Sequence, residues 1–364
     1  MRKLCSVQKI EWLRPIEGRD FIELAGVLGW QVIVKKGEFS VGDLCVYVEI
    51  DSQLPEKPEF EFLRSKKFRI RTMKMAGVIS QGIVFPLTIL PAREKPWEIG
   101  EDVTSIMEVT KYDPQEQEDE PWYKNPNAMP APKKWYQKLP LMRFTWYRKM
   151  FGPKSRKAGF PDFISKTDET RIQSAPWLLN SDDLYWVATE KVDGTSGTFA
   201  LVRQKHFLRK DTFEYIVCSR NLRLLKDNSI YWQVSDKYNI EYALRNLIGN
   251  HDWVAIQGEC IGPKIQKNKY RRDSPELYVF NLIYPEGRRP SMSAKGLLET
   301  RGLDFVPIVW EKFTLPETVE EMIKLAHGQS ALADTLREGL VVRSLDGKKS
   351  FKAVDPEFLL KYSE

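Results

Sequence analysis

The sequence predicts an α+β protein in which a small β-barrel precedes a mixed domain of strands and helices. Residues 1–108 consist of short apolar segments separated by turns, whereas strand-like and helix-like segments alternate across residues 161–364. Residues 109–160 between them have the composition of a linker followed by a basic and aromatic segment. A chain of 364 residues is long enough for two domains of ordinary size and a connector.

The barrel is predicted from five short strand-like segments with no long helical period between them. These segments are residues 21–24, 30–34, 44–50, 68–73 and 82–85. Strands at this spacing are typical of small barrels, and an OB-fold is the form we expect. Several cations crowd the segment at 68–73, and we expect Lys67, Arg69 and Arg71 to contact nucleic acid. A solvated sheet edge is the alternative explanation for this charge.

The connector changes character along its length. An acidic patch and a proline-rich stretch at residues 125–132 are followed by residues 133–160, which contain nine lysines and arginines and no acidic residue. Aromatic residues, among them Trp135, Tyr136, Phe144, Trp146 and Tyr147, are interleaved with these cations. Cations that meet phosphates beside rings that stack on bases suit a surface for a single strand or a nick. We expect Lys133, Lys134, Arg148 and Lys149 to contact nucleic acid. Alternatively, the rings pack on the next domain.

The second domain is predicted from alternating strand and helix patterns. Apolar segments at 184–188 and 198–202 indicate buried strands. Residues 239–248 and 318–327 carry apolar side chains at helical spacing, and a glycine follows each segment. All the side chains that suggest chemistry lie in this domain.

Composition excludes several classes of site. The four cysteines are far apart, which fits neither a disulfide framework nor a cysteine-rich zinc site, and only three histidines are present. Any metal chemistry must therefore use carboxylates and a hard cation such as Mg²⁺. The formal charge of +6 alone is weak support for a polyanionic partner. No membrane-length apolar stretch or signal peptide is visible, so we expect a cytoplasmic protein, without a membrane partner and monomeric.

The first chemical signal is the segment Lys191–Gly197, which lies between two apolar strands. A lysine attacks phosphorus only when it is neutral, and burial or a nearby cation lowers a lysine pKa. Asp193 can hold a metal ion or its water, and Gly194 allows a tight turn against a nucleotide. The alternative is an Asp-Gly hairpin turn with an exposed lysine, because Lys-x-Asp-Gly occurs by chance in roughly one protein of this length in ten to twenty.

Further residues of suitable chemistry follow this segment in order. They are Arg220 after a strand, Glu259 at a strand end, Phe280 in an aromatic segment, Glu338 at the head of a strand, and the cluster of Lys348, Lys349 and Lys352. An arginine can clamp a phosphate and a ring can stack on a purine. Each residue alone has an ordinary structural explanation, but their joint order makes chance a poor account.

This series, over residues 185–355, resembles the covalent nucleotidyltransferase superfamily of ATP-dependent DNA and RNA ligases and mRNA capping enzymes. The matching positions are Lys191–Gly194 with motif I, Arg220 with motif Ia, Glu259 with motif III, Phe280 with motif IIIa, Glu338–Val341 with motif IV and Lys352 with motif V. Motif V is commonly Lys-x-Lys, but Ser350 stands in its first position here. We expect Lys349 or Lys348 to supply that charge.

The order of the domains indicates which group within this superfamily the chain resembles. A barrel before the nucleotidyltransferase domain, which ends soon after motif V, is similar to the Deinococcus/Naegleria-type RNA ligases, as are residues 163–173. Capping enzymes and DNA ligases instead carry their OB domain after motif V, and capping enzymes usually have arginine where Ser196 stands. The alternatives left open are a capping guanylyltransferase, a DNA ligase, or a non-catalytic RNA-binding protein.

The resemblance implies a ligase-type domain of antiparallel sheets and helices that seals 3′-hydroxyl and 5′-phosphate ends of RNA. RNA repair at nicks in duplexes, either RNA or RNA/DNA, is the expected setting. ATP would be the co-substrate, Mg²⁺ or Mn²⁺ the metal, and a lysyl-AMP adduct at Lys191 the intermediate. Lys352 and Glu338 would assist catalysis.

The resemblance also assigns binding residues. Those implied to bind the nucleotide are Glu190, Asp193, Gly194, Arg220, Glu259, Phe280, Glu338, Lys349 and Lys352. Among them, Asp193, Glu259 and Glu338 are expected to contact the metal ion through water. Phe280 would stack on adenine, and Glu190 would read the edge of the base.

Overall fold

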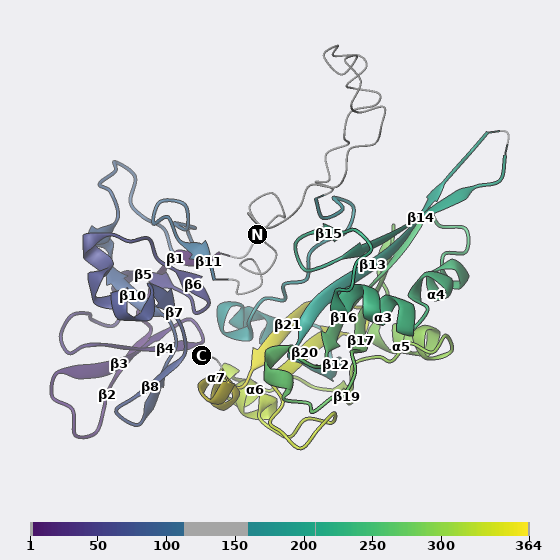
Figure 1. Ribbon diagram of the computed structural model, residues 1–364. Helices are drawn as coiled ribbons and strands as arrows, with labels where there is room; N and C mark the ends of the chain where they lie inside the picture. Colours follow the sequence, from purple (N-terminus) through teal and green to yellow (C-terminus); the bar gives the residue numbers. More distant parts are fainter. Residues whose placement is uncertain (1–2, 113–158, 208, 363–364) are drawn as a thin grey trace, which may run out of the picture.

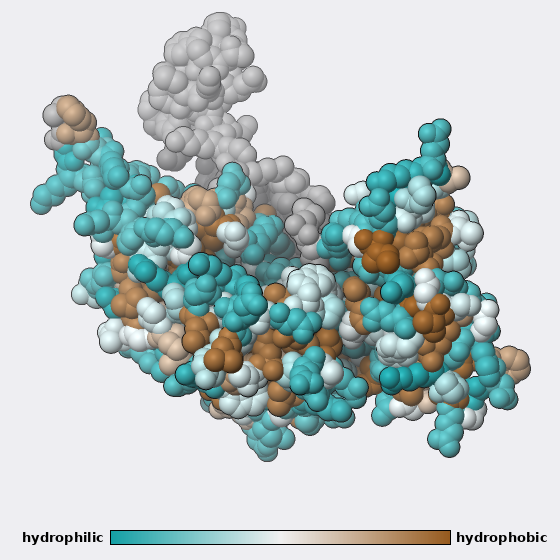
Figure 2. Space-filling model, turned by 180° about the vertical axis from the view of Figure 1, so that it is seen from behind, coloured by the Kyte–Doolittle hydropathy of each residue, from teal (hydrophilic) through white to brown (hydrophobic). Residues whose placement is uncertain are grey.

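The computed structural model describes residues 3–112, 159–207 and 209–362 and contains two sheet-rich parts (Figure 1). Most of the predicted linker, and with it Lys133, Lys134, Arg148 and Lys149, lies outside the described residues. None of the described helices is long and apolar enough to cross a membrane. On the face seen in Figure 2, hydrophobic residues lie in groups among hydrophilic ones over both parts.

The N-terminal part consists of short antiparallel strands around one apolar core. The strands are β1 (Cys5–Lys9), β2 (Trp12–Pro15), β3 (Ile22–Val27), β4 (Trp30–Lys35), β5 (Leu44–Val48), β6 (Ser52–Gln53), β7 (Arg69–Ile70), β8 (Met73–Met75), β9 (Val78–Ser80), β10 (Ile83–Pro86) and β11 (Thr110–Lys111). They pair in the orders β1-β5-β10, β2-β3-β4, β11-β6-β7 and β8-β9. Short 3-10 helices lie at Pro58–Lys66 and Leu87–Ile89.

Four of the five predicted barrel segments correspond to single strands, and the segment at 68–73 does not. There the chain leaves one sheet after Ile70 and joins another at Met73, because β7 pairs with β6 whereas β8 pairs with β9. Between them the buried Thr72 hydroxyl accepts a hydrogen bond from Gln81 Nε2 at 3.1 Å. That contact directs Thr72 inward at the point where the strand is interrupted.

The C-terminal part contains two antiparallel sheets. The larger has the order β15-β14-β13-β16-β17-β18, and the smaller has the order β19-β12-β20-β21. Their strands are β12 (Trp186–Glu190), β13 (Thr195–Gln204), β14 (Thr212–Cys218), β15 (Arg223–Leu224), β16 (Trp253–Ile261), β17 (Glu276–Tyr284), β18 (Gly287–Arg288), β19 (Ile308–Phe313), β20 (Gly339–Ser344) and β21 (Ser350–Val354). Short 3-10 helices lie at Ile172–Ser174, Pro176–Asn180 and Gln266–Asn268.

Helices cover the outer faces of these sheets and leave the inner faces for the site (Figure 1). They are α3 (Ile230–Lys237), α4 (Ile240–Leu247), α5 (Ser291–Glu299) and α6 (Val319–Ala326). The first three pack on the larger sheet, and α6 packs on the smaller one. A further helix, α7 (Pro356–Tyr362), instead contacts the core of the barrel through Leu359. Both helices predicted from apolar spacing, α4 and α6, are present. A capping box begins α6, since Thr318 Oγ1 accepts from the Glu321 N–H and the Glu321 carboxylate accepts from the Thr318 N–H.

The two parts meet along the segment that precedes β12. Trp30 Nε1 donates to Ser174 Oγ at 3.2 Å, and the Gly29 N–H donates to the Gln173 carbonyl at 2.9 Å. Nearby, the buried Arg171 pairs with Asp51 at 2.8 Å. These contacts join the barrel to the segment at 171–174, which packs against β21 and α6 of the C-terminal part.

Candidate active site

One cavity of about 880 Å³ connects the two sheets of the C-terminal part with the barrel. Its wall includes Lys191 after β12, Glu259 in β16, Phe280 in β17 and Val341 in β20. The barrel contributes Arg69 among others. A volume of this size lies within the range of cavities that enclose nucleotide-sized ligands.

Lys191 is held at the end of β12 by the neighbouring strand. Its backbone N–H donates to the Gly339 carbonyl at 2.9 Å, which fixes the start of β20 beside it. Its Nζ donates to Glu338 Oε2 at 2.6 Å, with the two side chains 25% and 13% exposed. The pairing of β12 with β20 therefore brings together a lysine and a carboxylate that are distant in the sequence.

The protein groups around Lys191 favour its charged form. Burial lowers the pKa of Lys191, but the carboxylates of Glu338, Glu259 and Asp193 attract the ammonium group and raise the pKa overall. The sequence led us to expect that burial or a nearby cation would lower this pKa. That expectation is wrong for the protein groups alone, because three carboxylates surround the one nitrogen.

The turn after Lys191 is packed tightly against β16. The Gly194 N–H donates to Glu259 Oε1 at 3.1 Å, and a Cβ atom at Gly194 would lie 2.3 Å from the Cys260 carbonyl oxygen. The Asp193 N–H donates to the Tyr270 hydroxyl at 2.9 Å. An exposed Asp-Gly hairpin turn, the alternative for this segment, is thereby contradicted.

Glu259 lies inside β16 (Trp253–Ile261), two residues before the strand ends, rather than at the end itself. Burial raises the pKa of Glu259 to about 8; the Lys191 ammonium group opposes this shift, and repulsion from Asp193 and Glu338 adds to it. Across the described ranges, no three Asp, Glu, His or Cys side chains are arranged to ligate a metal ion directly.

The apolar part of the wall and Glu190 form a separate region. Phe280 and Val341, both half-buried, line the cavity together with Val306. The Glu190 carboxylate is buried, and its oxygens accept from Ser330 Oγ at 2.5 Å and from the Ala331 N–H at 2.8 Å. Both oxygens of Glu190 therefore support the loop at 330–331, and because Glu190 also lines the cavity, its contact with the base stays a prediction.

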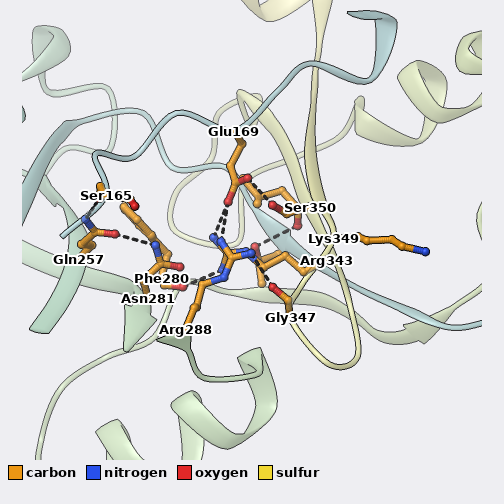
Figure 3. Close-up of polar contacts among 12 residues, drawn as sticks. Ser165, Glu169, Gln257, Phe280, Asn281, Arg288, Arg343, Gly347, Lys349 and Ser350 are labelled. Carbon is orange, nitrogen blue, oxygen red and sulfur yellow. Dashed lines mark hydrogen bonds and ion pairs between the residues drawn. The ribbon is translucent and has the colours of Figure 1, made fainter. Parts of the chain in front are cut away.

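The C-terminal lysines differ in where they point. Lys352 lines the cavity, and its Nζ donates to Asp168 Oδ1 at 3.1 Å. Lys349 instead pairs with Asp183 at 2.7 Å, its side chain is 44% exposed, and Figure 3 shows it directed away from the cluster of polar side chains. Side chains alternate along β21, so Ser350 and Lys352 share a face, whereas Lys349 precedes the strand and is not part of the cavity wall. The expectation that Lys349 lies at the nucleotide is corrected.

Three charged residues that sequence reasoning missed lie beside Ser350 (Figure 3). Glu169 Oε1 accepts from Arg288 Nη1 at 3.0 Å and from Arg343 Nη2 at 3.1 Å, and Ser350 Oγ donates to Glu169 Oε2 at 2.5 Å. Arg343 also donates to the Phe280 carbonyl at 2.7 Å. The serine in motif V was the one visible signal of this cluster.

The charges in this cluster stabilise one another. Burial raises the pKa of Glu169, but Arg343, Arg288 and the Ser350 hydroxyl outweigh it, so the pKa lies below its usual range. Burial lowers the pKa of Arg343 to about 10, which leaves it charged at neutral pH.

Comparison with known families identifies the two parts. A model of an OB-fold domain matches residues 4–87, and a model of RNA ligase matches residues 184–362. Residues 184–362 belong to the RNA ligase family. The predicted fold class, an OB-fold before a ligase domain of antiparallel sheets and helices, and the predicted class of enzyme are confirmed. The family makes nucleic acid the substrate class.

Solved structures agree with this assignment over the whole length. Naegleria gruberi RNA ligase with PPi is 28% identical, with a TM-score of 0.78 over 100% of this chain and 99% of that chain. A mutant of that enzyme with ATP and Mn gives the same identity and TM-score over 100% of both chains. Another mutant, with AMP and Mn, matches equally over 100% and 99%. No curated protein sequence gives a significant match.

The OB-fold domain and the ligase domain both place cations at the cavity. Arg220 follows β14 and lines the wall, and Arg69 lines it from β7, with its guanidinium 3.9 Å from the ring centroid of Tyr112. Lys67 is exposed and Arg71 half-buried, and neither forms part of this wall. In this protein, therefore, an arginine of the OB-fold domain borders the cavity of the ligase domain.

Proposed function

We propose that the protein is an ATP-dependent RNA ligase that seals 3′-hydroxyl and 5′-phosphate ends through a lysyl-AMP adduct at Lys191. The observation that carries this proposal is Lys191 itself, hydrogen-bonded to Glu338 in a nucleotide-sized cavity of an RNA ligase domain. The Naegleria gruberi enzyme has been solved with PPi, with ATP and Mn, and with AMP and Mn. Adenylylation of a lysine would consume ATP and release PPi, and the final sealing step would release AMP.

The proposed reaction has three phosphoryl transfers. Lys191 Nζ attacks the α-phosphorus of ATP, a P–N bond forms, and the P–O bond to the departing pyrophosphate breaks. A 5′-phosphate oxygen of the RNA then attacks the same phosphorus, so the P–N bond breaks and AMP is transferred to the RNA end. Finally the 3′-hydroxyl attacks the 5′-phosphate, a phosphodiester forms and AMP leaves. Such transfers depend on in-line positioning and charge neutralisation.

Lys191 must lose a proton before the first step. Glu338 accepts its hydrogen bond at 2.6 Å and is the group we assign to receive that proton. A cation bound near Asp193, Glu259 and Glu338 would weaken their hold on the ammonium form and so lower the pKa of Lys191.

The residues present fit a hard divalent cation. Burial, with repulsion from Asp193 and Glu338, raises the pKa of Glu259, and a cation bound beside these three carboxyl groups would relieve that repulsion. Oxygen-only donors suit Mg²⁺ or Mn²⁺, and we propose that Asp193, Glu259 and Glu338 contact the ion through its water. When bound, the ion would offset negative charge at the α-phosphate.

The remaining roles follow from position in the cavity wall. We propose that Phe280 stacks on adenine opposite Val341, and that Arg220 and Lys352 bind phosphates. Gly194 is needed because of the close approach of Cys260. Lys349 is left out of the nucleotide contacts because its ammonium group pairs with Asp183, whereas Glu190 lines the cavity and is kept as the residue proposed to read the edge of the base.

Arg69 on the OB-fold domain is our proposed contact with the RNA near the break, since it lines the cavity. The contacts predicted for Lys67, Arg71, Lys133, Lys134, Arg148 and Lys149 remain predictions, as do the domain boundaries at 108 and 160. A nick in an RNA or RNA/DNA duplex is the proposed substrate, and a monomer in the cytoplasm the proposed form.

The test is covalent labelling with α-³²P-ATP and Mg²⁺ or Mn²⁺, followed by denaturing electrophoresis. Wild-type protein should carry label and Lys191→Met should carry none, while circular dichroism shows both folded. Labelled protein should then seal a nicked duplex with an RNA 3′-hydroxyl end. Label from GTP alone would indicate a capping guanylyltransferase, and sealing of all-DNA nicks alone a DNA ligase. Absence of label from every nucleotide would contradict enzymatic activity.

A further inference from the structure

Lys269 is a charged residue next to the site that the proposed chemistry does not use. It lies in the loop between β16 and β17, and its ammonium group is ion-paired with the Asp193 carboxylate. Its side chain is only 8% exposed. On its other side, the Nζ atom lies 4.5 Å from the ring centroid of Phe358 and 4.7 Å from that of Tyr362. One carboxylate and two aromatic rings therefore enclose a single positive charge.

The loop that carries Lys269 is attached to the motif I turn. The Tyr270 hydroxyl accepts from the Asp193 N–H at 2.9 Å. Two neighbouring residues of the loop therefore contact Asp193, with Lys269 at its carboxylate and Tyr270 at its backbone. Gln266, Lys267 and Asn268 adopt φ values of 43°, 57° and 49°. Three consecutive non-glycine residues in the left-handed region are strained, and such strain persists only where surrounding contacts hold it.

Both rings of the enclosure belong to α7, and α7 is anchored on two sides. The Tyr362 hydroxyl is 2.8 Å from Thr335 Oγ1 in the ligase domain. Leu359, the residue that follows Phe358, packs against the apolar core of the OB-fold domain. Phe358 is buried. The position of these rings, and with it the position of Lys269, depends on how α7 sits between the two domains.

We propose that Lys269 is a built-in counter-cation for Asp193, held in place by Phe358 and Tyr362, that competes with the divalent metal ion at this carboxylate. The inference rests on the proposed function, because it concerns the carboxylate assigned to metal-bound water. An ammonium group in contact with Asp193 occupies its acceptor sites and repels a second cation. Lys269 must therefore move away from Asp193 when the metal ion binds, and α7 determines how readily it does so.

The other simple role for Lys269, a grip on ATP phosphates, predicts the opposite result. If Lys269 bound phosphate, its removal would weaken binding of the metal–nucleotide complex. If it competes with the metal ion, its removal leaves Asp193 without a partner and strengthens metal binding. The sign of the change distinguishes the two.

The experiment measures Mn²⁺ binding by electron paramagnetic resonance of free Mn²⁺, with α,β-methylene-ATP present. Lys269→Met should lower the Kd for Mn²⁺ by about tenfold, the order expected for one charge removed at close range in a partly screened site. The control is Lys264→Met, an exposed lysine of the same loop that lies outside the cavity wall, which should change the Kd by less than about twofold.

A second variant keeps Lys269 and removes its enclosure. Phe358→Leu combined with Tyr362→Leu retains apolar side chains in α7 but removes both rings, and should lower the Kd for Mn²⁺ in the same direction by a smaller factor. The metal concentration that half-saturates labelling of Lys191 should fall in parallel. If Lys269→Met folds, an unchanged or higher Kd for Mn²⁺ overturns the proposal. If it does not fold, the same result in the double variant overturns it. Binding of Mn²⁺ is measured without turnover, so this experiment tests the role of Lys269 alone. The proposed function is tested separately, because absence of labelling in wild-type protein would contradict it.

Discussion

Lys191 Nζ lies 2.6 Å from Glu338 Oε2, although 147 residues separate the two in the chain. The antiparallel pairing of β12 with β20 produces this contact, with Glu190 opposite Leu340. Because both residues lie at strand ends, the register of two strands positions the nucleophile and its proton acceptor. A rigid sheet holds such geometry better than a loop does.

Replacing the acceptor tests the proton transfer. Glu338→Gln keeps the shape but removes the charge that favours the ammonium form of Lys191, so the pKa of Lys191 should fall. The acceptor is also lost, and single-turnover labelling should slow by about 100-fold or more. Rates measured between about pH 6 and pH 9 should rise with pH, with a midpoint at lower pH than in wild type. A midpoint that does not move would contradict the assigned pairing.

The raised pKa of Glu259 predicts how stability depends on pH. A carboxyl group whose pKa is about 8 when folded and about 4.5 when unfolded binds more protons in the folded state between those values, so stability is lost as pH rises through this window. Glu259→Gln removes this loss and can still accept from the Gly194 N–H. Its free energy of unfolding relative to wild type should increase by roughly 3 kcal/mol from about pH 5 to about pH 8. Urea denaturation at several pH values measures it, and a difference independent of pH would refute it.

The Glu169 cluster predicts a loss of stability rather than of chemistry alone. Glu169→Gln leaves Arg343, which is almost fully buried, and Arg288 without their anionic partner. Removing one partner of a buried ion pair costs about 3 kcal/mol or more. Urea denaturation should show this loss, and Glu169→Gln combined with Arg343→Met should recover part of it. A single variant as stable as wild type would mean that the cluster is already well solvated.

The periodicity of apolar residues predicts several of the strands and helices of this fold. The helices α4 and α6 lie within one residue of their expected bounds, and β3 and β4 overlap their expected segments, because their apolar spacing is local. The order of Lys191, Glu259, Phe280 and Glu338 between strands likewise predicted one site. In contrast, the break between β7 and β8 depends on pairing with two different partners, which local spacing does not encode.

Contacts between distant charges were invisible in the sequence. Glu169 meets Arg288 and Arg343 only because three separate segments converge, and Lys269 meets Asp193 through a loop with no regular period. The position of Lys349, in contrast, could have been predicted from the sequence. Ser350 and Lys352 share one face of a strand by simple alternation, and this pattern already excluded Lys349 from that face.

That alternation gives a matched pair of variants. Lys352→Met removes a cation from the cavity wall and should slow Lys191 labelling by about 100-fold, in keeping with loss of a charged phosphate contact in a confined site. Lys349→Met removes the same charge three residues earlier, where the side chain pairs with Asp183, and should change the rate by less than about twofold. Single-turnover labelling compares them. A large effect at Lys349 would restore it as the missing lysine of motif V.

Arg69 tests whether the OB-fold domain acts on the RNA or on the nucleotide. Its guanidinium lies over the Tyr112 ring at the cavity wall, on the barrel side of the Lys191 region. Arg69→Met should reduce sealing of a nicked duplex by about tenfold, with a weaker dependence on salt, because one phosphate contact is lost. Labelling of Lys191 should change by less than about twofold, since the residues proposed to bind ATP all lie in the ligase domain. Lys36→Met, an exposed lysine of the same domain away from this cavity, serves as the charge-matched control. Equal losses of labelling and sealing in Arg69→Met would instead mean that the OB-fold domain supports nucleotide binding, and the proposed RNA contact at Arg69 would then be wrong.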